Sequence, residues 1–417
     1  MKTKQITLAA LAMLSFNSFA QLSIDGEFRP RTEYRHGFKQ LATDDADAAF
    51  FTSQRTRLNA GYKTEKYDFH LSFQDTRIWG DAGQLNENPF SLSIHQAWSN
   101  IHLSKKFDLK LGRQEIAYDD QRIFGNVGWA QQARSHDAAI VKYKNDGLNM
   151  DLGLAFNQNQ AGLEGTNYQI GNNYKSLQYL RVNKAWDNFE GSVLVLNNGL
   201  QNLTNSPEED YETFYSQTIG THFKYKLNES LKFTGNVYFQ TGKDRADRDV
   251  SAHLFGLEAS YKEKDSKLNY GLGFEMQSGN AYDENTKNNA FTPFYGTNHK
   301  FNGLMDYFYV GNHGNSVGLV DLYGKIGFKL KDKSQITAMA HYFTSAEDIN
   351  ADGDRDLGTE IDLVYSHKLN ADVTIKAGYS HMLASDGLAA LRGGNADNTN
   401  NWGWLMLVVK PKLFTSK

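Results

Sequence analysis

Short and long connections alternate strictly along this chain, and no other feature of the sequence limits the fold as much. Eight short polar turns alternate with nine longer connections, so together they join eighteen segments. The turns lie at 64–66, 104–106, 144–146, 185–187, 228–230, 263–266, 331–333 and 369–371, and the longer connections include 80–90, 118–135, 158–173, 242–251, 278–317 and 383–400. Such alternation places all the short turns, and both chain ends, at one end of an antiparallel sheet.

The segments between these connections have the period-two pattern of half-buried β-strands. In residues 231–240, Leu231, Phe233 and Phe239 share one face, and Lys232 and Gln240 share the other. The pattern recurs at 23–35, 68–73, 217–227, 253–262, 268–277, 335–342, 359–366 and 372–380.

A soluble β-sandwich would show the same local alternation, so the connections decide the fold class. Outer-membrane barrels have an even number of strands, short periplasmic turns and long extracellular loops. The sequence therefore predicts an all-β protein, a transmembrane antiparallel β-barrel of eighteen strands. In such a barrel the apolar face of each strand meets lipid and the polar face lines the lumen.

The first twenty residues have the three parts of a secretory signal peptide. Lys2 and Lys4 precede a short apolar run at 6–16, and Ser18 and Ala20 frame a small-x-small cleavage site. The run is too short for a membrane-spanning helix, and a buried N-terminal helix is the alternative. We expect a cleaved signal peptide over residues 1–20 and a barrel over 21–417 in the bacterial outer membrane.

Composition excludes several other classes of protein. The chain has no cysteine, which rules out disulfides and thiolate metal or redox chemistry. It has no second long apolar run, whereas 13% aromatic residues suit the girdles of a barrel. A net charge of −4 gives no reason to expect nucleic acid. Membrane lipid and lipopolysaccharide are the expected surroundings.

Strand parity points many charged side chains into the lumen. The arginines among them are Arg29, Arg31, Arg35, Arg55 and Arg57, and the acids are Asp25, Glu27, Asp108, Glu258, Glu275, Glu360 and Asp362. A lipid-facing Arg or Lys at the midplane would cost about 2–4 kcal/mol, so charges inside strands should point inward. Two interpretations stay open and are compatible. The groups form ion pairs that brace the wall, or they make a charged path for an anionic solute.

Several motifs resemble the bacterial alginate-export outer-membrane family. They are Leu111-Gly-Arg-Gln-Glu-Ile-Ala-Tyr-Asp-Asp-Gln-Arg122, Trp129, Arg134-Ser-His-Asp137, Gln74-Asp-Thr-Arg-Ile-Trp-Gly80, Arg55-Thr-Arg-Leu58 and Gly358-Thr-Glu-Ile-Asp362. The resemblance runs from about residue 25 to the end of the chain. It implies an eighteen-stranded barrel that passes an acidic, alginate-like polysaccharide or oligosaccharide by passive diffusion through an arginine-rich constriction. Carried over by position, the pore-lining set is Arg55, Arg57, Asp75, Arg77, Arg113, Gln114, Arg122, Arg134 and Asp137.

Function is therefore expected to be transport without chemistry. A general or differently selective porin is the alternative, and periplasmic export machinery is a candidate partner. An enzyme would need a serine, a histidine and an acid converging at one rim. Gly314-Asn-Ser-Val-Gly318 matches a nucleophile-elbow pattern, but it lies in a loop that leads into a strand, where that motif has no catalytic context.

Two of the predicted pore arginines conflict with simple parity. Arg113 falls on the face of Leu109 and Leu111, and Arg77 falls on the face of Phe73. Either Gly112 marks a β-bulge that resets the register, or these arginines lie at the rim of the barrel.

A loop near the C-terminal end has the spacing of a calcium site. Its oxygen-bearing side chains are Asp348, Asn350, Asp352, Asp354 and Asp356, with Gly353 at the turn. The twelfth position is Thr359 rather than Glu, so the loop is not a full EF-hand. The spacing predicts a structural calcium ion in an extracellular loop, and a solvated acidic loop is the alternative.

Overall fold

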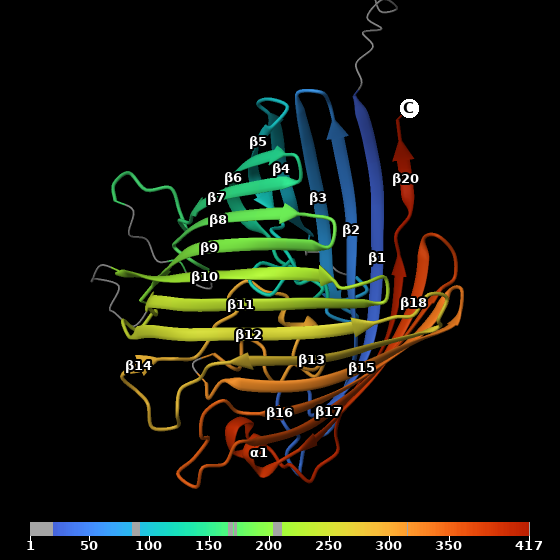
Figure 1. The fold of residues 1–417 in the computed structure, drawn as a ribbon. Helices are drawn as coiled ribbons and strands as arrows, with labels where there is room; N and C mark the ends of the chain where they lie inside the picture. Colours follow the sequence, from blue (N-terminus) through green and yellow to red (C-terminus); the bar gives the residue numbers. More distant parts are fainter. Residues whose placement is uncertain are drawn as a thin grey trace, which may run out of the picture.

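A computed structural model describes residues 20–85, 92–165, 170, 173–202, 211–314 and 316–416 of the chain. These residues form a closed antiparallel barrel of eighteen strands, which confirms the predicted fold class (Figure 1). The strands are β1 (Gln21–His36), β2 (Ala49–Lys63), β3 (Tyr67–Ile78), β4 (Leu92–His102), β5 (Phe107–Gln114), β6 (His136–Asn145), β7 (Leu148–Phe156), β8 (Ser176–Ala185), β9 (Phe189–Gln201), β10 (Thr213–Lys226), β11 (Leu231–Lys243), β12 (Asp249–Tyr261), β13 (Leu268–Gln277), β15 (Leu319–Lys331), β16 (Ser334–Thr344), β17 (Asp356–Lys368), β18 (Val373–Ala384), and β19 (Asn400–Val409) continued by β20 (Lys412–Thr415).

The barrel closes between its first and last strands, which lie side by side in Figure 1. Arg31 of β1 is opposite Met406 of β19, and Ile24 is opposite Phe414 of β20. Pro411 divides this last barrel strand because proline has no N–H to donate to the ladder. Its carbonyl still accepts from the backbone N–H of Gly26 at 3.0 Å, which keeps the seam closed.

Three short elements lie outside the barrel wall. They are β14 (Lys287–Asn288), which pairs in parallel with the start of β12, the 3-10 helix η1 (Asn298–Lys300) and the helix α1 (Asp386–Arg392). No helix in the described part of the chain is long and apolar enough to cross a membrane. The barrel begins at Gln21, directly after the predicted cleavage site. Residues 1–19 lie outside the described residues, so the signal peptide stays a prediction.

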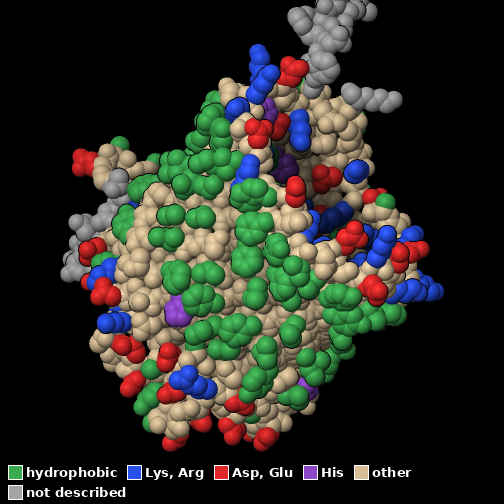
Figure 2. Space-filling model, in the orientation of Figure 1, with side chains coloured by type: hydrophobic (Ala, Val, Ile, Leu, Met, Phe, Trp, Pro, Cys, Tyr) green, Lys and Arg blue, Asp and Glu red, His purple; other side chains and the backbone are tan. Residues whose placement is uncertain are grey.

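Strand parity separates an apolar outer wall from the lumen, as predicted. Phe239, Leu257 and Leu272 point outward and are 53%, 49% and 64% exposed, whereas the inward Gln240 is 4% exposed. Figure 2 shows hydrophobic side chains spread over the wall and charged side chains gathered toward its edges. Outward leucine and phenylalanine side chains are unfavourable in water and favourable in contact with lipid, as expected of an outer-membrane barrel.

Two long extracellular loops fold back into the barrel, which the sequence did not predict. They are residues 115–135, between β5 and β6, and residues 278–318, between β13 and β15. The first loop packs Ile123 and Phe124 against inward residues of the wall such as Leu196. The second packs Tyr307 and Phe308 into a cluster that includes Trp402 of β19.

The expectation that the inner face of each strand is polar is therefore wrong in part. Inward positions on β8 and β9 carry Leu177, Leu194 and Leu196, which are at most 3% exposed. These side chains serve as docking surfaces for the inward loops, because burying them against Phe124 and Ile123 removes apolar area from water in the lumen.

The orientation of the barrel can be tested by labelling, since the native chain has no cysteine. Asn285 is exposed at the outer part of the 278–318 loop, and Glu229 is exposed in a short turn at the opposite end. We expect a membrane-impermeant maleimide to label N285C on intact cells and to label E229C only after the outer membrane is broken. The reverse pattern would mean that the predicted inside and outside are exchanged. Many other residues of the 278–318 loop are buried, so the labelled position has to be chosen from the exposed part.

Candidate pore constriction

Arginine side chains of β1 and β2 hold the 115–135 loop inside the lumen by donating hydrogen bonds to its backbone carbonyls. Arg29 donates from Nη1 to the Gly128 carbonyl at 2.6 Å and from Nη2 to the Trp129 and Ala130 carbonyls, both at 3.1 Å. Arg31 Nη1 donates to the Trp129 carbonyl at 2.8 Å. Peptide carbonyls are neutral, so these hydrogen bonds position the loop without cancelling the arginine charges.

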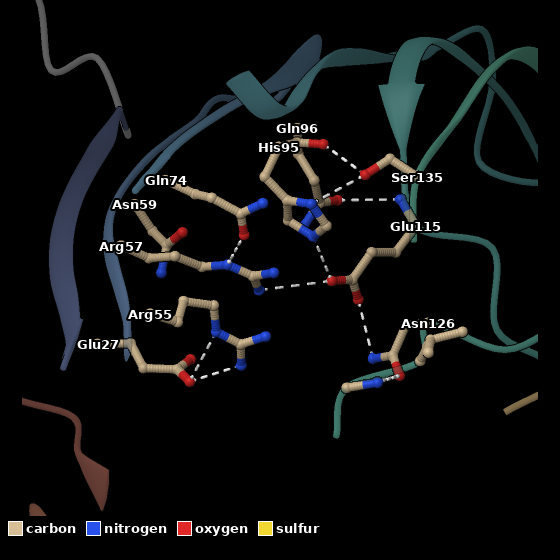
Figure 3. A network of polar contacts seen from close by, with 12 residues as sticks. Glu27, Arg55, Arg57, Asn59, Gln74, His95, Gln96, Glu115, Asn126 and Ser135 are labelled. Carbon is tan, nitrogen blue, oxygen red and sulfur yellow. Dashed lines mark hydrogen bonds and ion pairs between the residues drawn. The ribbon is translucent and has the colours of Figure 1, made fainter. Parts of the chain in front are cut away.

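We call Arg29, Arg31, Arg35, Arg55 and Arg57 the arginine wall. Three glutamates pair with it. Glu27 lies 2.6 Å from Arg55, Glu33 lies 2.8 Å from both Arg31 and Arg35, and Glu115 lies 3.7 Å from Arg57. Figure 3 shows Arg55 and Arg57 projecting from β2 toward Glu27 and Glu115. Within this set, five guanidinium groups face three carboxylates, which is an excess of two positive charges.

Glu115, at the start of the loop, is held as a carboxylate by its neighbours. His95 Nε2 lies 2.7 Å from Glu115 Oε1, and Asn126 donates to Oε2 at 3.0 Å (Figure 3). Burial alone would raise the pKa of Glu115, but these hydrogen bonds and Arg57 together lower the pKa below its usual value. Ser135, at the end of the loop, donates to the His95 carbonyl at 2.6 Å, so one histidine ties both ends of the loop to β4.

A hollow of about 530 Å³, lined by basic, aromatic and acidic side chains, lies beside the outer end of the arginine wall. The Arg31 guanidinium stacks over Trp129 at 4.1 Å from the ring centroid, and the Arg35 guanidinium lies over Phe38 at 4.2 Å. Lys39 also lines the hollow. Stacked arginines keep their edges free to donate hydrogen bonds, so this hollow offers both apolar surface and positive charge to a ligand.

Another part of the lumen carries buried carboxylates. Glu275 of β13, Asp321 of β15, and Glu360 and Asp362 of β17 form this acidic wall, and each is at most 6% exposed. Whereas the arginine wall binds loop carbonyls, the acidic wall binds loop donors. The Asn302 amide donates to Glu275 at 2.9 Å and to Asp321 at 3.1 Å, and the Met305 N–H donates to Glu360 at 2.8 Å.

The two inward loops are also joined to each other across the lumen. Arg122 of the 115–135 loop pairs with Glu275 and donates to Asn302 Oδ1 at 3.0 Å. Its guanidinium lies over Phe301 at 4.5 Å from the ring centroid. Arg122 is 1% exposed, so it acts as a brace between the first loop and the acidic wall.

The predicted pore residues divide into an inward and an outward group. Arg55 and Arg57 point into the lumen, and Gln114 is buried there, with its amide donating to the Ala138 carbonyl at 2.9 Å. Arg122 and Arg134 belong to the 115–135 loop, and Arg134 donates to the Gly296 carbonyl of the second loop at 3.1 Å.

The other four predicted residues form two ion pairs on the outer face. Arg77 lies 2.7 Å from Asp75 on β3, and Arg113 of β5 lies 2.8 Å from Asp137 of β6. The register runs through Gly112 without a shift in both pairings of β5, so the proposed bulge there is wrong. Arg77 and Arg113 each precede the last residue of their strands at the loop end, which fits the rim alternative.

Sequence reasoning missed the backbone acceptors of the 115–135 loop. Carbonyl groups occur at every residue and have no sequence signature, so nothing marked Gly128 or Ala130 as partners of arginines. The inward leucines of β8 and β9 were the one available signal that something apolar fills the lumen there.

The predicted calcium ligands do not converge on one point. Asp348 is paired with Arg355 at 2.7 Å, and the Asn350 amide donates to Asp354 at 2.8 Å. In the described ranges no group of three or more His, Cys, Asp or Glu side chains is placed to hold a metal ion. A cation there would have to displace Arg355 from Asp348, and calcium binding by this loop stays a prediction.

Among the described residues around the nucleophile-elbow match, no strand-to-helix turn is present. Ser316 lies shortly before β15, and Asn315 lies outside the described residues. His313 is buried, and its Nε2 lies 2.9 Å from the Gly318 carbonyl. Burial and the nearby Arg392 lower the pKa of His313 to about 3, so it is neutral at ordinary pH.

Comparison with solved structures places the fold among outer-membrane porins. OccK11 (OpdR) of Pseudomonas aeruginosa has a TM-score of 0.62 at 12% identity, covering 95% of this chain and 96% of that chain. OccAB4 of Acinetobacter baumannii has a TM-score of 0.61 at 13% identity, with 94% and 98% covered. A BenF-like porin of Pseudomonas fluorescens Pf-5 has a TM-score of 0.61 at 11% identity, with 94% and 99% covered. At these identities the likeness shows the fold alone.

Sequence comparison supplies the family. No curated protein matches the chain. The model of the family described as alginate export matches residues 20–401, which is most of the chain and confirms the resemblance seen in the motifs. Family and fold are both of the outer-membrane channel type, while the absence of enzymatic activity stays a prediction. The chain is an outer-membrane β-barrel channel that belongs to the alginate export family.

Proposed function

We propose that this channel passes an acidic polysaccharide or oligosaccharide of the uronate type by passive diffusion. The observation that carries the proposal is the positive excess of the arginine wall beside the 115–135 loop. The family match supports an alginate-like solute as the first candidate. Periplasmic export machinery stays a candidate partner.

The contacts of the arginine wall suit a path of weak and repeated binding. Arg29 and Arg31 donate to neutral carbonyls of the 115–135 loop, and a carboxylate is a stronger acceptor than a carbonyl. The carboxylate of a uronate unit can therefore replace a loop carbonyl as the hydrogen-bond acceptor at one arginine and then at the next. The glutamates keep each site from holding an anion too tightly, as conduction requires.

Blocking of single channels in planar bilayers tests this proposal. We expect oligouronates to reduce the potassium chloride current at concentrations at least about tenfold lower than neutral oligosaccharides of equal length, which corresponds to roughly 1.4 kcal/mol of preference. The matched neutral oligosaccharide controls for size. Equal block by both sugars would reject an acidic substrate and favour a general porin.

A further inference from the structure

A second hollow at the outer mouth differs from the arginine wall in its charges. It measures about 360 Å³, within the range of small-molecule sites, and lies between the end of the 115–135 loop, the loop after β11 and the 278–318 loop. His136 lines it and is opposite Gln114 in the β5–β6 pairing, and both are buried toward the lumen. The hollow therefore opens inside the ring of strands, away from lipid.

Two arginines line this hollow, and none of its described lining residues is an acid. They are Arg134 and Arg245, and neither has an ion pair within the described ranges. The acids closest to Arg245 in sequence are already engaged, since Asp244 pairs with Arg248 at 2.8 Å and Asp247 pairs with Lys243 at 3.2 Å. Every arginine of the arginine wall, in contrast, has a glutamate within 4 Å.

Arg134 is the less exposed of these two arginines. Its guanidinium makes one hydrogen bond in the described structure, to the neutral Gly296 carbonyl at 3.1 Å. Burial lowers the pKa of Arg134, which shows that its charge has lost solvation without gaining a carboxylate. Since arginine stays protonated in proteins, a bound anion would offset this cost more fully than the Tyr295 ring, whose centroid lies 6.0 Å from the guanidinium carbon.

Fixed aromatic rings form the rest of the hollow. Phe294 and Tyr295 stack with their centroids 5.8 Å apart, and Tyr174 meets Tyr295 edge-on at 5.4 Å. The Tyr295 hydroxyl donates to Asn198, which holds the ring in place. Flat apolar rings beside hydrogen-bond donors suit a sugar, because its C–H face can pack on the ring while its polar groups reach the arginines.

We propose that this hollow binds a single hexuronate residue, with its carboxylate between Arg134 and Arg245 and its ring against Tyr295. This inference rests on the proposed function and adds to it a selective entry or exit site at the mouth, separate from the arginine wall. The hollow is large enough for one uronate unit.

Binding of monomers to the purified full-length protein in detergent micelles tests the site. We expect glucuronate to give saturation-transfer NMR signals, and its neutral methyl ester and glucose to give far weaker ones. R245Q, which alters an exposed side chain, should weaken glucuronate binding about tenfold, as loss of a charge-assisted hydrogen bond predicts. Adding R134Q should weaken it further.

The matched control is R113Q, which removes a positive charge near the same mouth but on the outer face. It should leave glucuronate binding unchanged. Native affinity in the R134Q/R245Q variant, or equal binding of the methyl ester, would overturn the site. Block of the channel current by oligouronates in planar bilayers distinguishes the two proposals. If oligouronates still block while glucuronate does not bind this hollow, the channel function stands and the mouth site is wrong.

Discussion

Replacing Arg35 and Arg57 by glutamine should abolish the preference of the channel for anions. The arginine wall then holds three guanidinium groups against three carboxylates, so its excess of two positive charges is removed. These two arginines are chosen because they make none of the hydrogen bonds to the 128–131 carbonyls that hold the loop. The double variant therefore tests ion selectivity without removing the hydrogen bonds that position the 115–135 loop.

The measurement is the reversal potential in a potassium chloride gradient. We expect the native channel to show an anion-selective potential and R35Q/R57Q to shift toward zero. R113Q serves as the control, since it also removes a positive charge but from the outer face. If both variants keep the native potential, the arginines brace the wall and selectivity arises elsewhere in the lumen.

The wall of the barrel was largely predictable from the sequence, because parity and turn spacing are local properties. The segment predicted at 231–240 lies within β11, and the turn before it falls where the structure has it. Parity also placed Arg113 on the face of Leu109 and Leu111, where the structure finds it. The family motif had suggested the lumen for the same residue. A motif states which residues recur, whereas parity states which face of a strand they occupy.

The filling of the lumen was not predictable, because its contacts join residues far apart in the chain. Arg122 reaches Glu275, and Arg29 reaches the Gly128 carbonyl, across separations that no local pattern records. This difference between local patterns and long-range contacts explains why only some of the predicted pore residues lie in the lumen. Arg55 and Arg57 were placed by parity, but Arg134 could be placed only once both inward loops were seen to meet at Gly296.

Removing the charge of Arg122 should release the 115–135 loop from the acidic wall. Arg122 and Glu275 are buried as a pair, with Asp321 hydrogen-bonded to the same Asn302. Breaking a buried ion pair by changing one partner costs about 3–5 kcal/mol, because the remaining charge is left without compensation. In R122Q the carboxylates of Glu275 and Asp321 face each other, so the loop should leave its docked position part of the time.

We expect R122Q to give larger and noisier single-channel currents and faster cleavage of the 115–135 loop by protease from outside. Heat-modifiable mobility on gels should stay native, since the strand ladder is untouched. The double variant R122Q/E275Q removes both charges and can keep a neutral amide contact, so it should recover much of the native current. Quiet, native-sized currents in R122Q would show that the arginine wall alone holds the loop. A double variant as noisy as R122Q would instead locate the effect in lost packing on Phe301 rather than in the uncompensated carboxylate.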